Sequence, residues 1–314
     1  MTPQSRQIRA FLLLGMVMVL WAGNSIVGRA VRFDVPPLTL AFIRWTGASL
    51  LLLPFAIGPL RRDWSAILAG WKPVLLLGAL GVGAFNALLY SGLRETPATN
   101  ALLLQAATPA LVVAFDRIFF GVRSPLLQNL GVAASILGVA MIVFQGNLAR
   151  AAALNFGGGD VLILGSVLVW SLYMVLLRWR PDISPISFVA ATFFIGVLAM
   201  APFAAWDWLS GNHIRWSVKV VGAFAYVAVL PSIVSYFIFN SAAHVLGPAR
   251  AGQTITLMPI FGAFLSAALL GEDLHGYHFV GMALILSGIG LSILAMRQQT
   301  RAGPAVGSSL EERA

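Results

Sequence analysis

The residue with the clearest capacity for chemistry in this chain is an arginine inside a hydrophobic stretch. Arg44 lies within the apolar segment 37–57, in the sequence FIRWTGASLLL. A charge at that depth in a membrane helix costs roughly 2.5–3.5 kcal/mol on insertion scales, so such residues face a bundle interior or a water-filled cavity. Arg44 could hold a substrate carboxylate or organise a polar network. It could equally fix neighbouring helices by bonding to their carbonyl groups.

Two other apolar segments each carry a tryptophan with a polar partner three residues later. Trp21 and Asn24 lie in segment 10–29, and Trp170 and Tyr173 lie in segment 159–178. Residues three apart share a helical face, and we expect Asn24 to lie at the same depth as Arg44. An aromatic and a polar group from each segment could line one crevice for a small amphipathic solute. The alternative is that each tryptophan packs against lipid or anchors its helix at the interface.

Prolines interrupt three of the apolar segments. Pro109 and Pro259 lie near the middle of segments 98–118 and 246–270, and Pro231 lies in segment 218–240. Proline removes one helical hydrogen bond and frees a carbonyl, which a membrane helix tolerates where a neighbour or a cavity satisfies that group. We therefore predict that the three prolines act as hinges or gates, with simple structural kinks as the alternative.

The candidate site residues are polar or aromatic side chains in these segments and in segment 72–93. The predicted substrate-binding residues are Trp21, Asn24, Arg44, Asn86, Tyr90, Gln105, Trp170, Tyr173, Tyr236, Asn240, Gln253 and Thr254. We predict no catalytic residue, metal site or cofactor, because the chain lacks HExxH, GxSxG and P-loop motifs. His275 and His278 are expected at a solvated helix start.

Composition places these residues in a membrane protein. The chain has 314 residues, of which 59% are hydrophobic and 10% are charged, whereas soluble domains are about 25% charged. Apolar runs of about 20 residues are long enough to cross a bilayer. We predict an all-α polytopic protein with ten transmembrane helices. Their expected limits are 10–29, 37–57, 72–93, 98–118, 125–145, 159–178, 184–205, 218–240, 246–270 and 275–295.

The basic residues indicate orientation, not nucleic-acid binding. The net charge is +9, but the arginines and lysines are scattered between apolar runs and form no patch with interleaved aromatics. Most of them fall in the loops on the same side as the N-terminus. The positive-inside rule therefore favours cytoplasmic N- and C-termini, with the lipid bilayer as a partner. There is no cysteine, which excludes disulfides and thiolate metal sites.

Several helix-punctuating residues recur at a constant spacing. Pro109 and Pro259, Gly121 and Gly271, Gly131 and Gly281, and Gly138 and Gly288 are each 150 residues apart. Five spans per half is an odd number, so the second half enters the membrane from the opposite side, as in many secondary transporters. We predict one five-helix repeat over 1–150, an inverted repeat over 151–296, and a disordered cytoplasmic tail over 297–314.

Three stretches carry a family resemblance. The sequences LWAGNSIVGRAV, FIRWTGASLLL and TLMPIFGAFLSAALLGEDL resemble the drug/metabolite transporter superfamily, in its ten-span branch with two EamA-type domains. In plan the chain is similar to YddG-like amino acid exporters. The resemblance implies a carrier in the bacterial inner membrane that moves small metabolites outward through a central cavity. One departure is that the first half has FGVRSP where the family often has a Gly-Glu pair, which only Gly271 and Glu272 keep.

These features together predict a function. We expect a carrier, not an enzyme, that exports neutral or aromatic amino acids or similar metabolites by alternating access. An alternative is efflux of toxic organic compounds, and an alternative of another class is a membrane scaffold or lipid-handling protein without transport. Substrate identity, coupling ion and the choice between monomer and homodimer stay open.

Overall fold

A computed structural model of the protein describes residues 3–121, 125–147, 149, 157–246 and 254–301. Every regular element within these residues is a helix, as predicted. The first half contains α1 (Pro3–Ala30), α2 (Pro37–Ala69), α3 (Trp71–Gly78), η1 (Ala79–Ala84), α4 (Phe85–Gly92), α5 (Ala98–Gln105), α6 (Thr108–Phe120) and α7 (Leu126–Val143). The second contains α9 (Gly158–Leu176), η2 (Leu177–Trp179), α10 (Pro185–Leu209), α11 (Val218–Val229), η3 (Leu230–Val234), α12 (Ser235–Leu246), η4 (Thr254–Leu257), α14 (Met258–Leu270) and α15 (Gly276–Arg301).

The helices are long and apolar enough for a multi-pass membrane protein. Among the described residues, 7 helical segments could cross a membrane, or 8 if the bent pair α5 and α6 forms one span. The shorter apolar helices Met258–Leu270 and Gly276–Leu291 occupy the last two predicted spans. Helices thus lie at all ten predicted positions, while the count of ten complete crossings stays a prediction.

Several predicted limits differ from the structure, among them the start of the first helix, which lies at Pro3 and not at residue 10. Gly58, Pro59 and the two arginines after them suggested a loop after residue 57, but α2 continues through both of its prolines to Ala69. Arg61 and Arg62 are therefore on a helix. At the other end of the chain, α15 extends to Arg301, into the stretch expected to be a tail.

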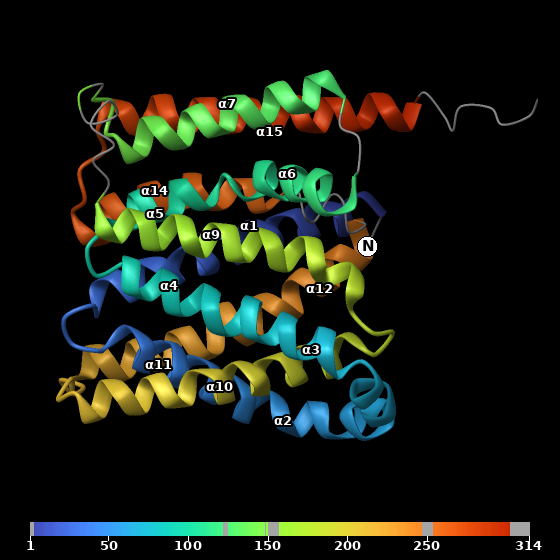
Figure 1. The fold of residues 1–314 in the computed structure, drawn as a ribbon, viewed down its shortest axis with the longest axis vertical. Helices are drawn as coiled ribbons and strands as arrows, with labels where there is room; N and C mark the ends of the chain where they lie inside the picture. Colours follow the sequence, from blue (N-terminus) through green and yellow to red (C-terminus); the bar gives the residue numbers. More distant parts are fainter. Residues whose placement is uncertain (1–2, 122–124, 148, 150–156, 247–253, 302–314) are drawn as a thin grey trace, which may run out of the picture.

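The helices lie roughly parallel or antiparallel in one bundle, and the two halves run in opposite directions. Figure 1 shows α1 starting at one end of the bundle and α9 starting at the other, while the last turn of α15 lies at the end where α1 begins. We call this end, which also holds the end of α2, the amino-terminal end, and the opposite one the far end. The arrangement fits an inverted repeat.

Equivalent residues of the two halves adopt the same local backbone. Gly121 ends α6 with φ 64° and Gly271 ends α14 with φ 66°, a left-handed conformation that favours glycine at helix ends. The π-helices η1 and η3 also fall in corresponding spans, about 150 residues apart. The repeat that the sequence predicts thus extends to the irregular turns of the chain.

Helices α7 and α15 pack against each other along a seam of small residues at one edge of the bundle (Figure 1). A Cβ atom on Gly281 would lie 3.0 Å from the carbonyl oxygen of Gly138, and one on Gly288 would lie 2.3 Å from that of Gly131. The lack of side chains at these glycines therefore allows the two helices to approach closely. In the interior, α5 is buried along most of its length.

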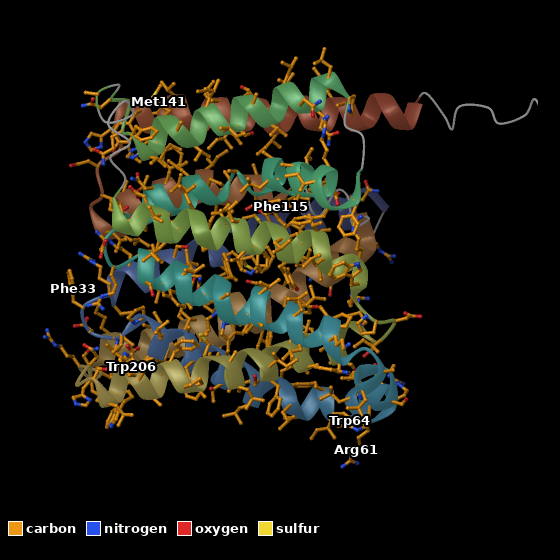
Figure 2. The ribbon with its side chains drawn as sticks, viewed as in Figure 1. Phe33, Arg61, Trp64, Phe115, Met141 and Trp206 are labelled. Carbon is orange, nitrogen blue, oxygen red and sulfur yellow. The ribbon has the colours of Figure 1, made fainter. Side chains whose placement is uncertain are left out.

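Large aromatic side chains mark both ends of the bundle. Figure 2 shows Phe33 and Trp206 at the far end and Trp64 at the amino-terminal end, beside Arg61. The three aromatic residues are 65%, 69% and 57% exposed, respectively. Aromatic side chains at such positions are typical of the two membrane interfaces.

Candidate functional site

Arg44 is the centre of a buried polar network that joins four helices. Its Nε donates to Ser232 Oγ at 3.0 Å, and its Nη1 donates to Asn86 Oδ1 at 2.9 Å and to Tyr90 Oη at 3.0 Å. The Tyr90 hydroxyl in turn donates to Asn24 Oδ1 at 2.7 Å. All five side chains are at most 7% exposed. Asn24 and Arg44 are thus linked through Tyr90.

The two π-helices position the partners of Arg44. Asn86 Nδ2 donates to the carbonyl of Val82 in η1 at 2.8 Å, and Ser232 Oγ, in η3, donates to the carbonyl of Val227 at 2.8 Å. A π-helical turn disturbs the regular backbone ladder and leaves carbonyls for side chains to satisfy. Because each hydroxyl or amide hydrogen is used on the backbone, the oxygens of Asn86 and Ser232 are oriented as acceptors toward Arg44.

Arg44 has no acidic partner. The ion pairs of the described residues involve Arg29, Arg178 and Lys219, and none involves Arg44. All of its hydrogen-bond acceptors are neutral oxygens, and Nη2 has no acceptor within the described part of the chain. The guanidinium also lies 4.4 Å from the Trp45 ring centre. The network therefore retains an uncompensated positive charge, which favours a bound anion.

The predicted aromatic residues flank this network. Trp21 Nε1 donates to the carbonyl of Pro231 at 3.0 Å, next to Ser232 in the chain. Trp170 stacks on Tyr173 with ring centres 4.9 Å apart and contacts Phe85, the neighbour of Asn86, at 4.8 Å. One aromatic group thus comes from the first helix of each half.

The remaining predicted binding residues lie elsewhere in the chain. Gln105 donates to the carbonyl of Ala101 in its own helix at 3.2 Å. Tyr236 packs at the edge of the cluster around Trp45, and Thr254 is buried in η4. Gln253 and the side chain of Asn240 lie outside the described residues.

A helix irregularity occurs at each predicted hinge proline. Pro109 is in the first turn of α6, after a bend of 41° from α5. Pro231 lies inside η3, and Pro259 is in the first turn of α14, directly after the 3-10 turn η4. Each proline thus lacks an amide hydrogen where the regular ladder is already interrupted.

Sequence reasoning omitted several contacts of the site. Ser232 was visible only as one of several polar residues near Pro231, and Trp45 only as the neighbour of Arg44. Nothing in the sequence indicated that Phe85 lies at the site, because phenylalanine is common in apolar spans. The π-helical turns that orient Asn86 and Ser232 have no compositional signature that would distinguish them.

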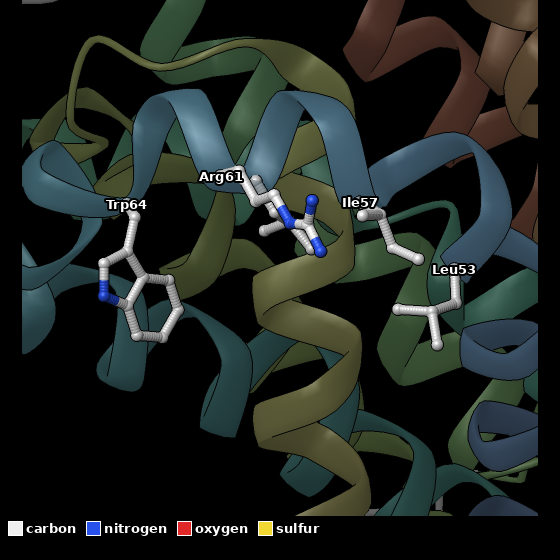
Figure 3. A pocket seen from close by; sticks show the side chains of 5 residues that line it. Leu53, Ile57, Arg61 and Trp64 are labelled. Carbon is white, nitrogen blue, oxygen red and sulfur yellow. The ribbon is translucent and has the colours of Figure 1, made fainter.

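An open groove on the bundle lies away from this network. It has a volume of about 550 Å³ and is lined by Leu53, Ile57, Leu60, Arg61 and Trp64 of α2. Figure 3 shows the labelled residues following one another along one side of that helix. None of the predicted site residues lines it.

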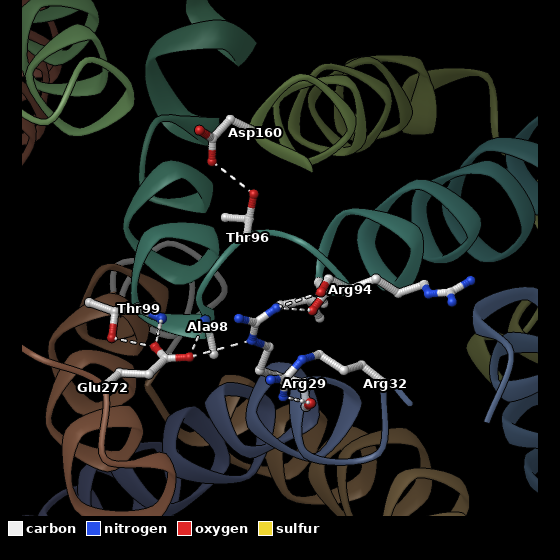
Figure 4. Close-up of polar contacts among 9 residues, drawn as sticks. Arg29, Arg32, Arg94, Thr96, Ala98, Thr99, Asp160 and Glu272 are labelled. Atoms are coloured by element: carbon white, nitrogen blue, oxygen red, sulfur yellow. Dashed lines mark hydrogen bonds and ion pairs between the residues drawn. The ribbon is translucent and has the colours of Figure 1, made fainter. Parts of the chain in front are cut away.

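A second polar cluster ties the two halves together at the far end (Figure 4). Glu272 accepts hydrogen bonds at 2.8 Å from the backbone amides of Ala98 and Thr99 and from the Thr99 hydroxyl. Arg29 Nε lies 3.7 Å from the same carboxylate. Glu272 therefore caps the first turn of α5, whose preceding residue, Pro97, offers no side-chain cap. The Gly-Glu pair of the second half thus has a structural role.

The histidine near this cluster differs from the prediction. His278 is 5% exposed, and its Nε2 lies 2.8 Å from Asn100 Oδ1. Its Nδ1 accepts the backbone amide of His275 at 3.0 Å, which caps the start of α15. The expectation of a solvated site was wrong for His278, because α15 packs this turn against α5.

The comparisons with known proteins identify the family. The model of the EamA-like transporter family matches residues 8–144 and again residues 157–294. The chain belongs to this family. The predicted resemblance is thus confirmed at the level of the drug/metabolite transporters, and the two matches fit a two-repeat architecture.

Relatives match along most of their length. An uncharacterized transporter of Archaeoglobus fulgidus is 27% identical over 300 residues, which cover 92% of this chain and 99% of the relative. The uncharacterized inner membrane transporter YedA of Escherichia coli (strain K12) is 25% identical, with 88% of each chain covered. The uncharacterized transporter YyaM of Bacillus subtilis is 26% identical over 68% of this chain and 70% of the relative.

A solved structure supports the fold. One crystal structure superposes with a TM-score of 0.59 at 22% identity and covers 93% of this chain and 99% of that one. Family, relatives and fold together establish a multi-pass membrane transporter and not an enzyme.

Proposed function

We propose that this transporter exports neutral or aromatic amino acids, or metabolites of similar size with one carboxylate. The observation that carries the proposal is the buried Arg44, which has neutral hydrogen-bond partners and no counterion in the described residues. A substrate with one negative group would supply the missing charge. A strongly anionic substrate would lack a second cation at this depth.

The surroundings of Arg44 suit the other parts of an amino acid. A carboxylate can accept from guanidinium N–H groups in a charge-assisted hydrogen bond, and Nη2 is the nitrogen without another acceptor. The Asn24 oxygen is an acceptor of the kind that an ammonium group needs. Trp21, Trp170 and Tyr173 provide apolar faces for an uncharged side chain.

Alternating access is the mechanism we propose for this movement. Inverted halves supply two related gates, one at each end of a shared site. The π-helices η1 and η3 and the bend at Pro109 are the points at which helices can change direction with least disturbance of regular bonding. The network around Arg44 includes hydrogen bonds to both π-helices. A substrate that binds Arg44 would therefore change the contacts of η1 and of η3.

We also propose a location in the bacterial inner membrane with both termini in the cytoplasm. The relative YedA is named an inner membrane transporter, and α1 starts where α15 ends, at one end of the bundle (Figure 1). Basic residues concentrate on that side, in loops and at helix ends. Reporter fusions active only in the cytoplasm would be active at both termini, and a periplasmic reporter at either terminus would contradict the orientation.

The test of function is transport by purified protein in liposomes. We expect uptake of a radiolabelled aromatic amino acid above that of empty liposomes, with competition by other neutral amino acids. Competition by the amide derivative, which lacks the carboxylate, should be much weaker. Flux no greater than in empty liposomes for the whole panel of amino acids would refute the proposal.

The alternative of toxic-compound efflux has a distinct outcome in the same assay. The aromatic cluster of Trp170, Tyr173 and Phe85 could accept a flat organic molecule. If organic compounds without a carboxylate are transported and amino acids neither move nor compete, the multidrug function replaces the one proposed here.

A further inference from the structure

The groove on α2 combines an apolar wall with an unpaired basic end. Leu53 and Ile57 are 45% and 41% exposed along its wall, while Arg61 and Trp64 stand at its end (Figure 3). These residues recur at helical spacing, so they form one stripe on the outer side of α2. Within the described residues, this stripe is open to the surroundings of the bundle.

The length of α2 places the two parts of the groove at different depths of a bilayer. About 20 helical residues at 1.5 Å each cross a hydrocarbon core roughly 30 Å thick, so a crossing that begins at Pro37 is complete near Ile57, well before the end of this 33-residue helix. The last turns of α2, with Arg61 and Trp64, therefore extend into the headgroup region. The turns with Leu53 and Ile57 stay at the depth of the acyl chains.

The charge at this end is free to bind an anion. Neither Arg61 nor the adjacent Arg62 forms an ion pair in the described part of the chain. The nearby acid, Asp63, accepts the amide of Ser184 at the start of α10 at 2.9 Å and also interacts electrostatically with Arg62. Arg61 is therefore the arginine of this pair without an acidic neighbour in the described residues. Arginine binds phosphate oxygens through paired N–H groups. Tryptophan favours the boundary between headgroups and acyl chains.

We propose that this groove is a binding site for one anionic phospholipid. The phosphate lies on Arg61 with Arg62 beside it, Trp64 contacts the glycerol region, and an acyl chain follows Leu53, Ile57 and Leu60. The site is distinct from the transport network around Arg44 and does not depend on what the protein transports.

Lipid retention measured by mass spectrometry tests the proposal. The full-length protein is reconstituted in nanodiscs with equal amounts of phosphatidylglycerol and phosphatidylcholine, then released into mild detergent and analysed intact. We expect phosphatidylglycerol adducts to predominate. Each basic residue near a membrane surface contributes about 1 kcal/mol, so Arg61→Gln should lower retention about fivefold. Arg61→Gln/Arg62→Gln should lower it further.

Arg94→Gln is the matched control, because Arg94 is exposed, has no ion pair in the described residues and lies at the far end, away from the groove. It should retain lipid like the unmodified protein. Equal retention of both lipids, or undiminished phosphatidylglycerol in the double variant, would overturn the proposal. So would displacement of the lipid by millimolar inorganic phosphate, because the site would then recognise a free anion without an acyl chain.

Discussion

The buried cation Arg44, whose hydrogen-bond partners among the described residues are all neutral, is the feature that most constrains the chemistry of this transporter. Arg44 bonds to Ser232 in the second half and to Asn86 and Tyr90 in the first. A purely structural arginine would reach the same energy with a carboxylate partner, or an apolar residue could replace it at little cost. Retaining the charge without a counterion is useful where the counterion arrives with the substrate.

Arg44→Lys tests this interpretation at the residue scale. Lysine keeps the charge, but its single nitrogen cannot span Ser232 and Asn86 as the guanidinium does. We expect KM for a transported amino acid to rise at least tenfold, measured as initial flux in proteoliposomes. Thermal unfolding in detergent should show that the free energy of unfolding falls by about 1–3 kcal/mol, because buried oxygens lose a hydrogen-bond donor.

Arg94→Lys provides the control, since its side chain is exposed and makes no ion pair in the described residues. An unchanged KM in Arg44→Lys, with stability reduced, would show that Arg44 only holds the helices together.

At the scale of elements, the regular parts of the fold were predictable and the irregular parts were not. Apolar length predicted the helices, and the repeated prolines and glycines predicted that they recur in two halves, because those properties depend on local sequence. The pairing of α7 with α15 came from the structure. The continuation of α2 beyond Pro59 was missed, because a proline ends a helix in isolation but not where its turn is supported by neighbours. The π-helices were missed for a related reason, since tertiary bonds such as that from Arg44 to Ser232 stabilise them.

The same limit applies to the candidate site. Residue type alone selected Asn24, Asn86 and Tyr90, because polar groups in a membrane span need partners. It could not show which of them meet Arg44, and it gave Gln105 equal weight although that side chain bonds to its own helix. Register between distant helices decides such contacts, and a single sequence carries little information about register.

The seam between α7 and α15 gives a prediction with an internal control. Gly288→Ala would place a methyl group 2.3 Å from the carbonyl oxygen of Gly131 and 3.0 Å from the amide nitrogen of Ser135, both of them backbone atoms. We expect a loss of about 1–3 kcal/mol in thermal unfolding. Gly290→Ala lies on the same helix with nothing within 4 Å, so it should be neutral or slightly stabilising. Equal stability of the two variants would show that the helices do not approach this closely.

The cap on α5 is a second test of an element. Glu272→Gln keeps one carbonyl oxygen but loses the charge that faces the amides of Ala98 and Thr99. Loss of a charged helix cap costs about 0.5–2 kcal/mol. We expect the free energy of unfolding to fall by that amount, measured by thermal unfolding. Asp273→Asn is the control, because this neighbour is exposed and its side chain caps no helix in the described residues. A drop in Asp273→Asn as large as that in Glu272→Gln would indicate a general charge effect and not a cap.

For the whole molecule, polar contacts between the halves occur at both ends of the bundle. At the far end, Lys219 Nζ pairs with Asp34 Oδ2 at 2.9 Å. At the amino-terminal end, Arg178 pairs with Asp116. These pairs are partly exposed, and exposed ion pairs contribute less than about 1 kcal/mol. Ion pairs of that strength can break and re-form within a transport cycle. A transporter that opens first at one end and then at the other requires such breakable contacts at both ends.

The absence of cysteine from the chain makes this proposal testable by paired cross-links. Asp34→Cys with Lys219→Cys joins the halves at the far end, and Asp116→Cys with Arg178→Cys joins them at the amino-terminal end. We expect oxidation of either pair to stop flux in proteoliposomes, because each end must separate once per cycle, and a reductant should restore it. The four single-cysteine variants should transport with or without oxidant. If both cross-linked proteins, verified as fully oxidised, transport at the reduced rate, the halves do not separate at these contacts and the alternating movement proposed here is wrong.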